Sequence, residues 1–437
     1  YFCFVYKKLM RKEVGKMDYK FLLDIAIILA STKILGLFTK KVNMPQVVGA
    51  LLAGVILGPA CVGVLTETDM IQNMAELGVI VLMFCAGMET DIEELKRSGK
   101  ASFVIALLGV IVPLVVGGGV AYLFINNGYI DTSDVTSSVF LQSVFIGVIL
   151  TATSVSITVE TLKELGKLKT KSGNAILGAA IIDDILGIIA LTIVTSLADT
   201  SVNIAVVLFK IVLFFVFCGV VGVIVYYAFK KWCEISGKGM HRHAIIAFVI
   251  CLVMAFCAEH FFGVADITGA FFAGLIISMT QKDQFIASKF DVLSYLLLSP
   301  IFFASIGLKV ELPKMGPAII AFAAVITLVA LLTKIIGCGL GAKVCGYKNY
   351  QALRIGVGMI SRGEVALIVA SKGAAVGLMS NNIMGPIIIV VVITTIITPI
   401  LLKPVFNKEI IPIEGEASLA DNYKKIDEYR TGEKQDN

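Results

Sequence analysis

Long apolar stretches follow one another along most of this chain, with only short polar segments between them. A helix that crosses the hydrocarbon core of a bilayer needs about 20 mainly apolar residues. Hydrophobic residues make up 57% of the 437 residues and charged residues 16%, whereas a soluble domain is about 45–50% apolar and about 25% charged. The sequence therefore predicts an all-α polytopic membrane protein whose solvent is the lipid bilayer.

We predict thirteen membrane-spanning helices from the length and composition of these stretches. The second, ninth and tenth are short or contain Pro or Gly, so an even number of spans is an alternative. The predicted spans cover residues 19–39, 45–64, 70–88, 101–125, 138–160, 174–197, 203–229, 243–260, 263–280, 291–307, 316–341, 350–371 and 383–405.

The loops between these spans alternate in charge. Loops that follow odd-numbered spans carry most of the loop Lys and Arg residues, whereas loops after even-numbered spans hold only Lys309, Lys314 and Lys372. Because short basic loops stay in the cytoplasm, this pattern predicts a chain with its N-terminus outside and its C-terminus in the cytoplasm.

The two ends of the chain differ from its apolar body. Residues 1–16 are basic although they lie on the predicted outer side, and a typical membrane-protein start follows at Met17. We expect residues 1–16 to be a non-native or untranslated extension, with an additional targeting segment as the alternative. Residues 406–437 are polar and charged without apolar periodicity, which predicts a disordered cytoplasmic tail.

The cysteines and histidines do not form the spacings of a metal site. Nine cysteines are scattered without a CxxC pair, so we expect neither a disulfide framework nor a zinc centre. His241 and His243 fall in a predicted cytoplasmic loop, where we expect exposed side chains; a pH-sensing role is the less favoured alternative. We also expect no cofactor, no enzyme activity and no nucleic-acid partner, since the sequence shows neither a catalytic constellation nor a basic face.

Charged residues lie inside several predicted spans, where each costs about 2.5–3.5 kcal/mol on insertion scales. Asp183 and Asp184 are near the middle of one span, Lys334 is well inside another, and Arg362 and Glu364 share a third. An isolated charge of this kind can serve as a buried ion pair that fixes helix packing. That alternative stays open for Arg362 and Glu364.

The adjacent pair Asp183 and Asp184 is harder to explain as structural. Neighbouring residues on a helix point about 100° apart, so one carboxylate can face a counter-charge while the other faces a cavity. Repulsion between the two carboxylates at low dielectric favours protonation of one of them. The same carboxylate can bind a metal cation instead, so the pair predicts a site where a proton and a cation compete.

Two predicted spans contain residues that interrupt helices. TATSVSIT at 151–158 is rich in hydroxyls that compete for backbone hydrogen bonds, and Gly356, Gly358 and Gly363 loosen the other span. If spans 1–6 and 8–13 are repeats of opposite orientation joined by span 7, the two interrupted spans occupy the same slot. Broken helices in matching positions indicate a transporter's binding site. The alternative is that these small residues only permit close helix packing.

These motifs together resemble a known family. TATSVSIT (151–158), GAAIIDDILG (178–187), the interior lysine of LTKIIGCGLGAK (332–343) and GVGMISRGEVALIVA (356–370) are similar to motifs of the monovalent cation:proton antiporter-2 family, of the bacterial NapA-type Na⁺/H⁺ antiporters. The likeness extends from about Met17 to residue 405. It implies the NhaA/NapA-like fold, with two inverted repeats and crossed discontinuous helices.

The resemblance also implies a division of the membrane domain, residues 17–405. A dimerisation part of about 17–90 and 243–307 would form a homodimer. A core part of about 101–197 and 316–405 would move against it, like an elevator, and carry the ion across the bacterial cytoplasmic membrane.

Each site residue receives a role from the same resemblance. Asp184 would bind the cation with Asp183 beside it, and Lys334 would pair with Asp183 when sodium is absent. The two aspartates imply electrogenic exchange of Na⁺ or Li⁺ for protons. A K⁺/H⁺ antiporter, a sodium-coupled symporter and a membrane sensor or channel remain alternatives. The remaining implied residues are Thr153 and Ser154, as oxygen ligands, and Arg362 and Glu364, as a supporting ion pair.

Overall fold

The computed structural model describes residues 19–41, 44–90, 92–135, 137–198, 204–235, 240–280, 282–310 and 315–406. These residues form helices and no strand, which confirms the all-α prediction. The predicted extension at 1–16 lies outside the described residues, as does the predicted tail except for Phe406.

Among the described residues, long helices and short helices are about equally frequent, and three short segments have wider or tighter helical turns. The elements are α2 (Lys20–Lys41), α3 (Gln46–Leu57), α4 (Asp69–Glu89), α5 (Ile92–Asn126), α6 (Val139–Ile149), α7 (Val155–Glu164), α8 (Lys171–Ala198), α9 (Ile204–Ile235), α10 (Met240–Cys257), η1 (Ala258–Phe262), α11 (Asp266–Ser278), α12 (Asp283–Leu293), η2 (Ser294–Leu298), α13 (Ser299–Leu308), α14 (Pro317–Val344), α15 (Asn349–Gly358), α16 (Glu364–Ala375), η3 (Asn381–Ile383) and α17 (Met384–Phe406).

Within the described ranges, nine helices are long and apolar enough to cross a membrane. Four further apolar helices are shorter, at Gln46–Leu57, Val139–Ile149, Asp266–Ser278 and Val365–Ala375. The difference from thirteen arises partly because the fifth and twelfth predicted spans are each divided into two short helices. The number thirteen therefore stays a prediction.

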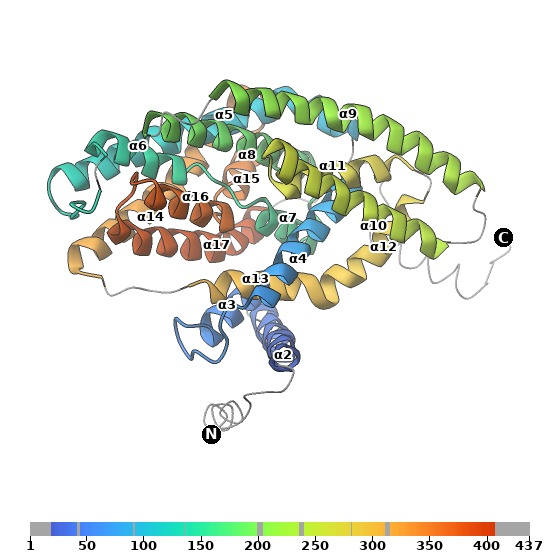
Figure 1. The fold of residues 1–437 in the computed structure, drawn as a ribbon, viewed down its shortest axis with the longest axis horizontal. Helices are drawn as coiled ribbons and strands as arrows, with labels where there is room; N and C mark the ends of the chain where they lie inside the picture. Colours follow the sequence, from blue (N-terminus) through green and yellow to red (C-terminus); the bar gives the residue numbers. More distant parts are fainter. Residues whose placement is uncertain are drawn as a thin grey trace.

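The helices pack in two bundles (Figure 1). In the first, α5 packs against α6, α8 and α14, and α14 packs against α15 and α17. We call α5–α8 and α14–α17 the crossing bundle, because it contains the two divided helices. We call α2–α4 and α10–α13 the paired bundle, in which α3 packs against α2 and α13, and α11 packs against α4 and α10.

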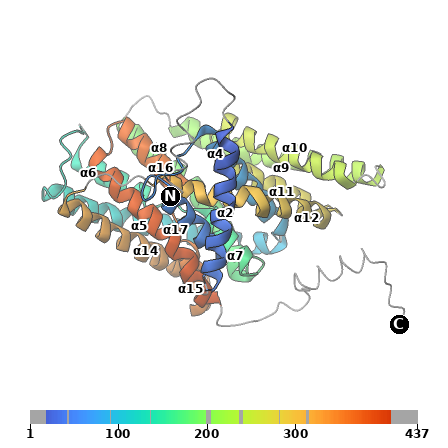
Figure 2. The ribbon, with the colours of Figure 1, turned by 90° about the horizontal axis from the view of Figure 1, so that it is seen from below.

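One long helix runs beside both bundles. α9 lies along the top of Figure 1 and contacts α8 of the crossing bundle and α11 of the paired bundle. Figure 2, seen from below, shows α5, α14 and α17 on one side and α10 to α12 on the other. The chain therefore enters each bundle twice, once before α9 and once after it.

The paired bundle contains the same close helix crossing twice. Gly54 on α3 meets Gly307 on α13, and Gly274 on α11 meets Gly87 on α4, so that at each crossing a Cβ atom would come closer than 3.0 Å to the partner backbone. Gly274 follows Gly54 by 220 residues, and Gly307 follows Gly87 by the same 220. The matching sequences GALLAG (49–54) and GAFFAG (269–274) therefore belong to the predicted second and ninth spans, and they mark the predicted repeat at the level of individual residues.

The crossing bundle repeats in the same way. Gly147 on α6 packs against the carbonyl of Leu114 on α5, and Gly356 on α15 packs against the carbonyl of Ile335 on α14. Gly356 follows Gly147 by 209 residues, and the two interruptions begin 209 residues apart, at 150 and 359. The two interrupted spans that the sequence analysis matched therefore also pack in matching ways.

The prediction for His243 was wrong. Its side chain is fully buried in α10, with ring centroids 4.5 Å from Trp232 and 6.3 Å from Phe229 of α9. The reason is that α10 begins at Met240, three residues before the predicted span. The side chain of His241 lies outside the described residues.

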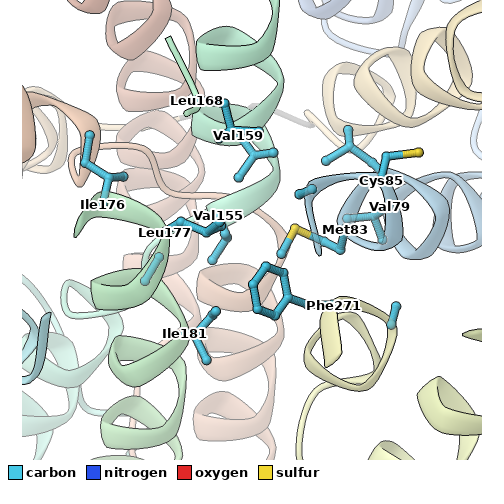
Figure 3. Close-up of a cluster of buried hydrophobic side chains, with 14 of the residues drawn as sticks. Val79, Met83, Cys85, Val155, Val159, Leu168, Ile176, Leu177, Ile181 and Phe271 are labelled. Atoms are coloured by element: carbon cyan, nitrogen blue, oxygen red, sulfur yellow. The ribbon is translucent and has the colours of Figure 1, made fainter. Parts of the chain in front are cut away.

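A cluster of apolar side chains lies where the two bundles meet. Figure 3 shows Val155 and Val159 of α7 and Ile181 of α8 facing Met83 of α4 and Phe271 of α11. All five are buried. This seam is therefore held mainly by non-directional apolar contact.

The glycine crossings generate a testable prediction. Replacing Gly54 or Gly274 by Ala should destabilise the protein by about 1–3 kcal/mol or more, since the added methyl group meets backbone atoms that cannot move aside. The measurement is the apparent melting temperature of purified protein in detergent.

The matched control is Gly219→Ala on α9, where nothing lies within 4 Å of an added Cβ. This variant should melt at the parent temperature or slightly above it, because Ala favours helix over Gly. Equal melting temperatures for all three variants would contradict the packing described here.

Candidate functional site

The two divided helices cross at their interruptions. α6 ends at Ile149 and α7 begins at Val155, while α15 ends at Gly358 and α16 begins at Glu364. The backbone N–H of Ser154 donates to the carbonyl of Ser361 at 2.7 Å, and the hydroxyl of Ser361 donates back to the carbonyl of Ser154 at 2.8 Å. Crossed discontinuous helices were predicted, and this contact confirms them.

Hydroxyl groups of the 151–158 motif satisfy carbonyls that the interrupted helices leave free. The Thr158 hydroxyl donates to the carbonyl of Gly358 at 2.7 Å and lies 2.9 Å from the Ser361 hydroxyl. The Thr153 hydroxyl lies 3.5 Å from the carbonyl of Met359. The last carbonyls of a helix have no partner within it, so these side chains allow the helices to stop inside the protein.

Asp183 of α8 and Lys334 of α14 form an ion pair inside the crossing bundle. The Lys334 ammonium donates to both carboxylate oxygens of Asp183, at 2.9 and 3.0 Å. Neither side chain is exposed by more than 2%. Gly109 of α5 lies against the pair, since a Cβ there would be 3.7 Å from the Lys334 ammonium and 3.8 Å from Asp183. Three helices, α5, α8 and α14, therefore enclose the two charges.

Asp184 differs from its neighbour. It is only partly buried, and no described residue donates a hydrogen bond to its carboxylate or forms a salt bridge with it within 4.0 Å. Asp183 and Lys334 act on it only through their charges. One aspartate of the pair is therefore neutralised by a lysine, and the other remains available to a proton or a cation.

Arg362 lies at the second interruption and is fully buried. Its two terminal nitrogens donate to the carbonyls of Ile360 and Leu150, each at 2.6 Å. These carbonyls follow the ends of α15 and α6, where the helix dipole is negative and a cation is stabilised. The predicted pairing with Glu364 is untested, because the side chain of Glu364 lies outside the described residues.

One family model matches most of the chain: the model described as "Sodium/hydrogen exchanger, transmembrane" covers residues 26–408. The chain belongs to this sodium/hydrogen exchanger family. It is accordingly an integral, multi-pass membrane protein.

Sequence similarity to relatives extends over nearly the whole exchanger. It is 39% identical over 393 residues to the Na(+)/H(+)-K(+) antiporter GerN of Bacillus cereus, across 90% of this chain and 97% of GerN. It is 36% identical over 399 residues to a Na(+)/H(+) antiporter of Enterococcus hirae, across 88% of this chain and 98% of the relative.

A solved structure shares the fold of the exchanger. The sodium proton antiporter MjNhaP1 of Methanocaldococcus jannaschii matches it with a TM-score of 0.62, over 87% of this chain and 95% of MjNhaP1. The sequence identity is 16%, so this likeness concerns the fold alone.

Sequence reasoning missed several residues of the exchanger's site. Thr394 accepts a hydrogen bond from the backbone N–H of Arg362 at 3.3 Å, and the Thr395 hydroxyl donates to the carbonyl of Arg362. The two threonines lie near the middle of α17, the helix that corresponds to α8 in the predicted repeat, directly after the positions that match the aspartate pair. That correspondence was the available signal. Ser361 and Gly109 had no comparable signal, because their roles depend on contacts between distant helices.

The buried ion pair of the exchanger generates a stability prediction. Asp183→Asn or Lys334→Met alone should destabilise the fold by about 3–5 kcal/mol, because each leaves an uncompensated buried charge. The double variant should recover much of this loss. Thermal melting of the four proteins in detergent measures the coupling between the two residues.

Asp184→Asn is the matched control, since Asp184 has no ion-pair partner among the described residues. It should melt close to the parent temperature. Simple addition of the two single losses in the double variant would show that Asp183 and Lys334 do not interact in the folded protein.

Proposed function

We propose that this protein exchanges Na⁺ or Li⁺ for protons across the bacterial cytoplasmic membrane by alternating access. The observation that carries the proposal is the carboxylate of Asp184, which has no hydrogen-bond or ion-pair partner among the described residues and follows an aspartate that Lys334 already neutralises. The names of the relatives from Bacillus cereus and Enterococcus hirae support the same pair of ions.

The proposed cation ligands are oxygen atoms of Asp184 and Asp183, with Thr153 and Ser154 at the interruption of the first broken helix. Na⁺ is a hard ion, and carboxylate, hydroxyl and carbonyl oxygens suit such ions. Thr153 is buried and its hydroxyl is only weakly engaged, at 3.5 Å, while the Ser154 hydroxyl lies 3.3 Å from that of Ser156. Both hydroxyls can therefore turn towards an ion at little cost.

Proton coupling follows from the ion pair. A cation that draws Asp183 away from Lys334 removes the counter-charge of the lysine, and a buried lysine without a counter-charge releases its proton readily. Asp184 releases a second proton when it binds the cation. In this scheme two protons move against one Na⁺, so that each cycle transfers one net positive charge.

The proposed moving part is the crossing bundle. Residues of about 101–197 and 316–405 would form the core and move past a dimerisation part of about 17–90 and 243–307, in a homodimer. The apolar seam of Figure 3 supports this division, since aliphatic side chains can slide past one another without breaking directional bonds. The basic loops support a C-terminus in the cytoplasm and an N-terminus outside.

A K⁺/H⁺ exchanger is the second candidate, because one relative is named a Na(+)/H(+)-K(+) antiporter. The first test uses everted vesicles of antiporter-deficient bacteria that express this chain. An interior-acid gradient is followed with a dye while Na⁺, Li⁺ or K⁺ is added. We expect Na⁺ and Li⁺ to dissipate the gradient. Asp184→Asn should abolish the response, because the neutral amide can neither bind and release a proton nor supply a negative charge for the cation.

Asp69→Asn removes an exposed carboxylate at the start of α4 and should respond like the parent. Dissipation by K⁺ alone would assign the protein to potassium exchange. No response to any of the three ions by correctly inserted protein would exclude antiport and favour a sodium-coupled symporter or a sensor.

The proposed stoichiometry predicts voltage dependence. With protein in liposomes, an inside-negative potential should accelerate Na⁺ efflux coupled to proton uptake, because two charges enter while one leaves. Each net charge gains about 2.3 kcal/mol per 100 mV. The measurement is ²²Na⁺ efflux at a series of clamped potentials. Rates that do not change with potential would show electroneutral exchange.

A further inference from the structure

The short helix α7 connects the ion site with the opposite end of the bundle seam. Thr153 and Ser154 precede its first turn, and Lys163 and Glu164 are its last two residues. Ten residues at about 1.5 Å each give a rod of about 15 Å. A force applied at Lys163 therefore reaches the interruption of the first broken helix directly.

Lys163 joins α7 to two helices of the paired bundle. Its ammonium lies 2.9 Å from a carboxylate oxygen of Glu89, the last residue of α4. It also forms an ion pair with Asp291 of α12. Lys163 is thus a single cation of the crossing bundle held between two anions of the paired bundle.

Glu164 makes a second attachment of opposite charge. Both of its carboxylate oxygens accept from the backbone N–H of Gln46, at 2.7 and 2.8 Å. Gln46 is the first residue of α3, whose N-cap Pro45 supplies no side-chain cap. An anion at a helix N-terminus satisfies free N–H groups and the positive end of the dipole, so Glu164 caps a helix of the other bundle.

These charged contacts differ from the apolar contacts that the rest of α7 makes with the paired bundle. Val155 and Val159 of the same helix face the apolar side chains of Met83 in α4 and Phe271 in α11 (Figure 3). A cavity of about 470 Å³ adjoins the charged end, with Glu160, Lys163 and Glu164 in its wall together with Lys33 and Phe303 of the paired bundle. The end of α7 therefore has both directional attachments and free space beside it.

We propose that Lys163 and Glu164 form a two-point clasp, which holds the crossing bundle against the paired bundle in the conformation described here and opens in each transport cycle. This inference rests on the proposed function, because it assumes that the bundles move during exchange. The side chains are partly exposed, at 25% for Lys163 and 34% for Asp291. Ion pairs at such positions are weak, which allows the clasp to open repeatedly.

The decisive experiment closes the clasp covalently. A version of the full chain without its nine cysteines is first shown to retain Na⁺-dependent exchange. Lys163→Cys and Asp291→Cys are then combined in it, and a short bifunctional methanethiosulfonate links the two thiols. We expect the linked protein to lose at least nine-tenths of its exchange rate and to regain it when a reductant cleaves the link.

The single variants Lys163→Cys and Asp291→Cys, treated with the same reagent, are the matched controls and should keep exchanging. Undiminished exchange by protein that mass spectrometry shows to be linked would overturn the proposal. Failure of the two thiols to link would overturn it as well, because it would place Lys163 and Asp291 out of reach of each other.

A second measurement keeps the native cysteines. Lys163→Gln opens one attachment without touching the cation ligands, so we expect at least a threefold rise in the maximal exchange rate with no loss of Na⁺ coupling. Lys169→Gln, at an exposed lysine in the loop that follows α7, should leave the rate unchanged. A rate within error of the parent for Lys163→Gln would count against the clasp. Absence of Na⁺-dependent exchange in the parent itself would instead refute the proposed function.

Discussion

The hydrogen bond between the backbones of Ser154 and Ser361 is the constraint on which the rest of this structure depends. Two helices stop inside a membrane protein, where free N–H and C=O groups cannot be left to lipid. Each broken helix therefore supplies hydrogen-bond partners for the other. The Thr158 hydroxyl donates to the carbonyl of Gly358, and Arg362 donates to the carbonyl of Leu150. The crossing fixes where α7 and α16 begin again, and so where the helices that enclose the ion pair must lie.

The charged side chains inside the crossing bundle differ in how far they are compensated. The terminal nitrogens of Arg362 donate to the carbonyls after α6 and α15, and Lys334 pairs with Asp183. Asp184 accepts no hydrogen bond from the described residues. It is therefore the member of the aspartate pair whose charge has no direct partner, and a buried charge without a partner favours neutralisation.

The sequence predicted the helical class, the charged residues inside the membrane and the two interrupted spans, because each leaves a local signal in hydrophobicity, charge or Gly, Ser and Thr content. The contact between Asp183 and Lys334 was accessible only through resemblance, since the residues lie on separate helices 151 positions apart. The roles of Ser361 and Gly109 depend on tertiary packing, which no local pattern encodes. His243 was misplaced because apolar periodicity locates helix ends only within a few residues.

The packing of the two halves is repeated, but the acidic pair is not. A duplicated chain could carry an acidic pair in each copy, and the two copies here use the same glycine crossings and the same interrupted helices. In the second copy, however, the 209-residue offset places Val392 and Ile393 at the positions of the aspartates. The hydroxyls of the next two residues, Thr394 and Thr395, hold the backbone of Arg362. The acidic pair therefore occurs in α8 but not in α17, although the helix packing around it occurs twice. The uncharged side chains of α17 support the second interruption instead.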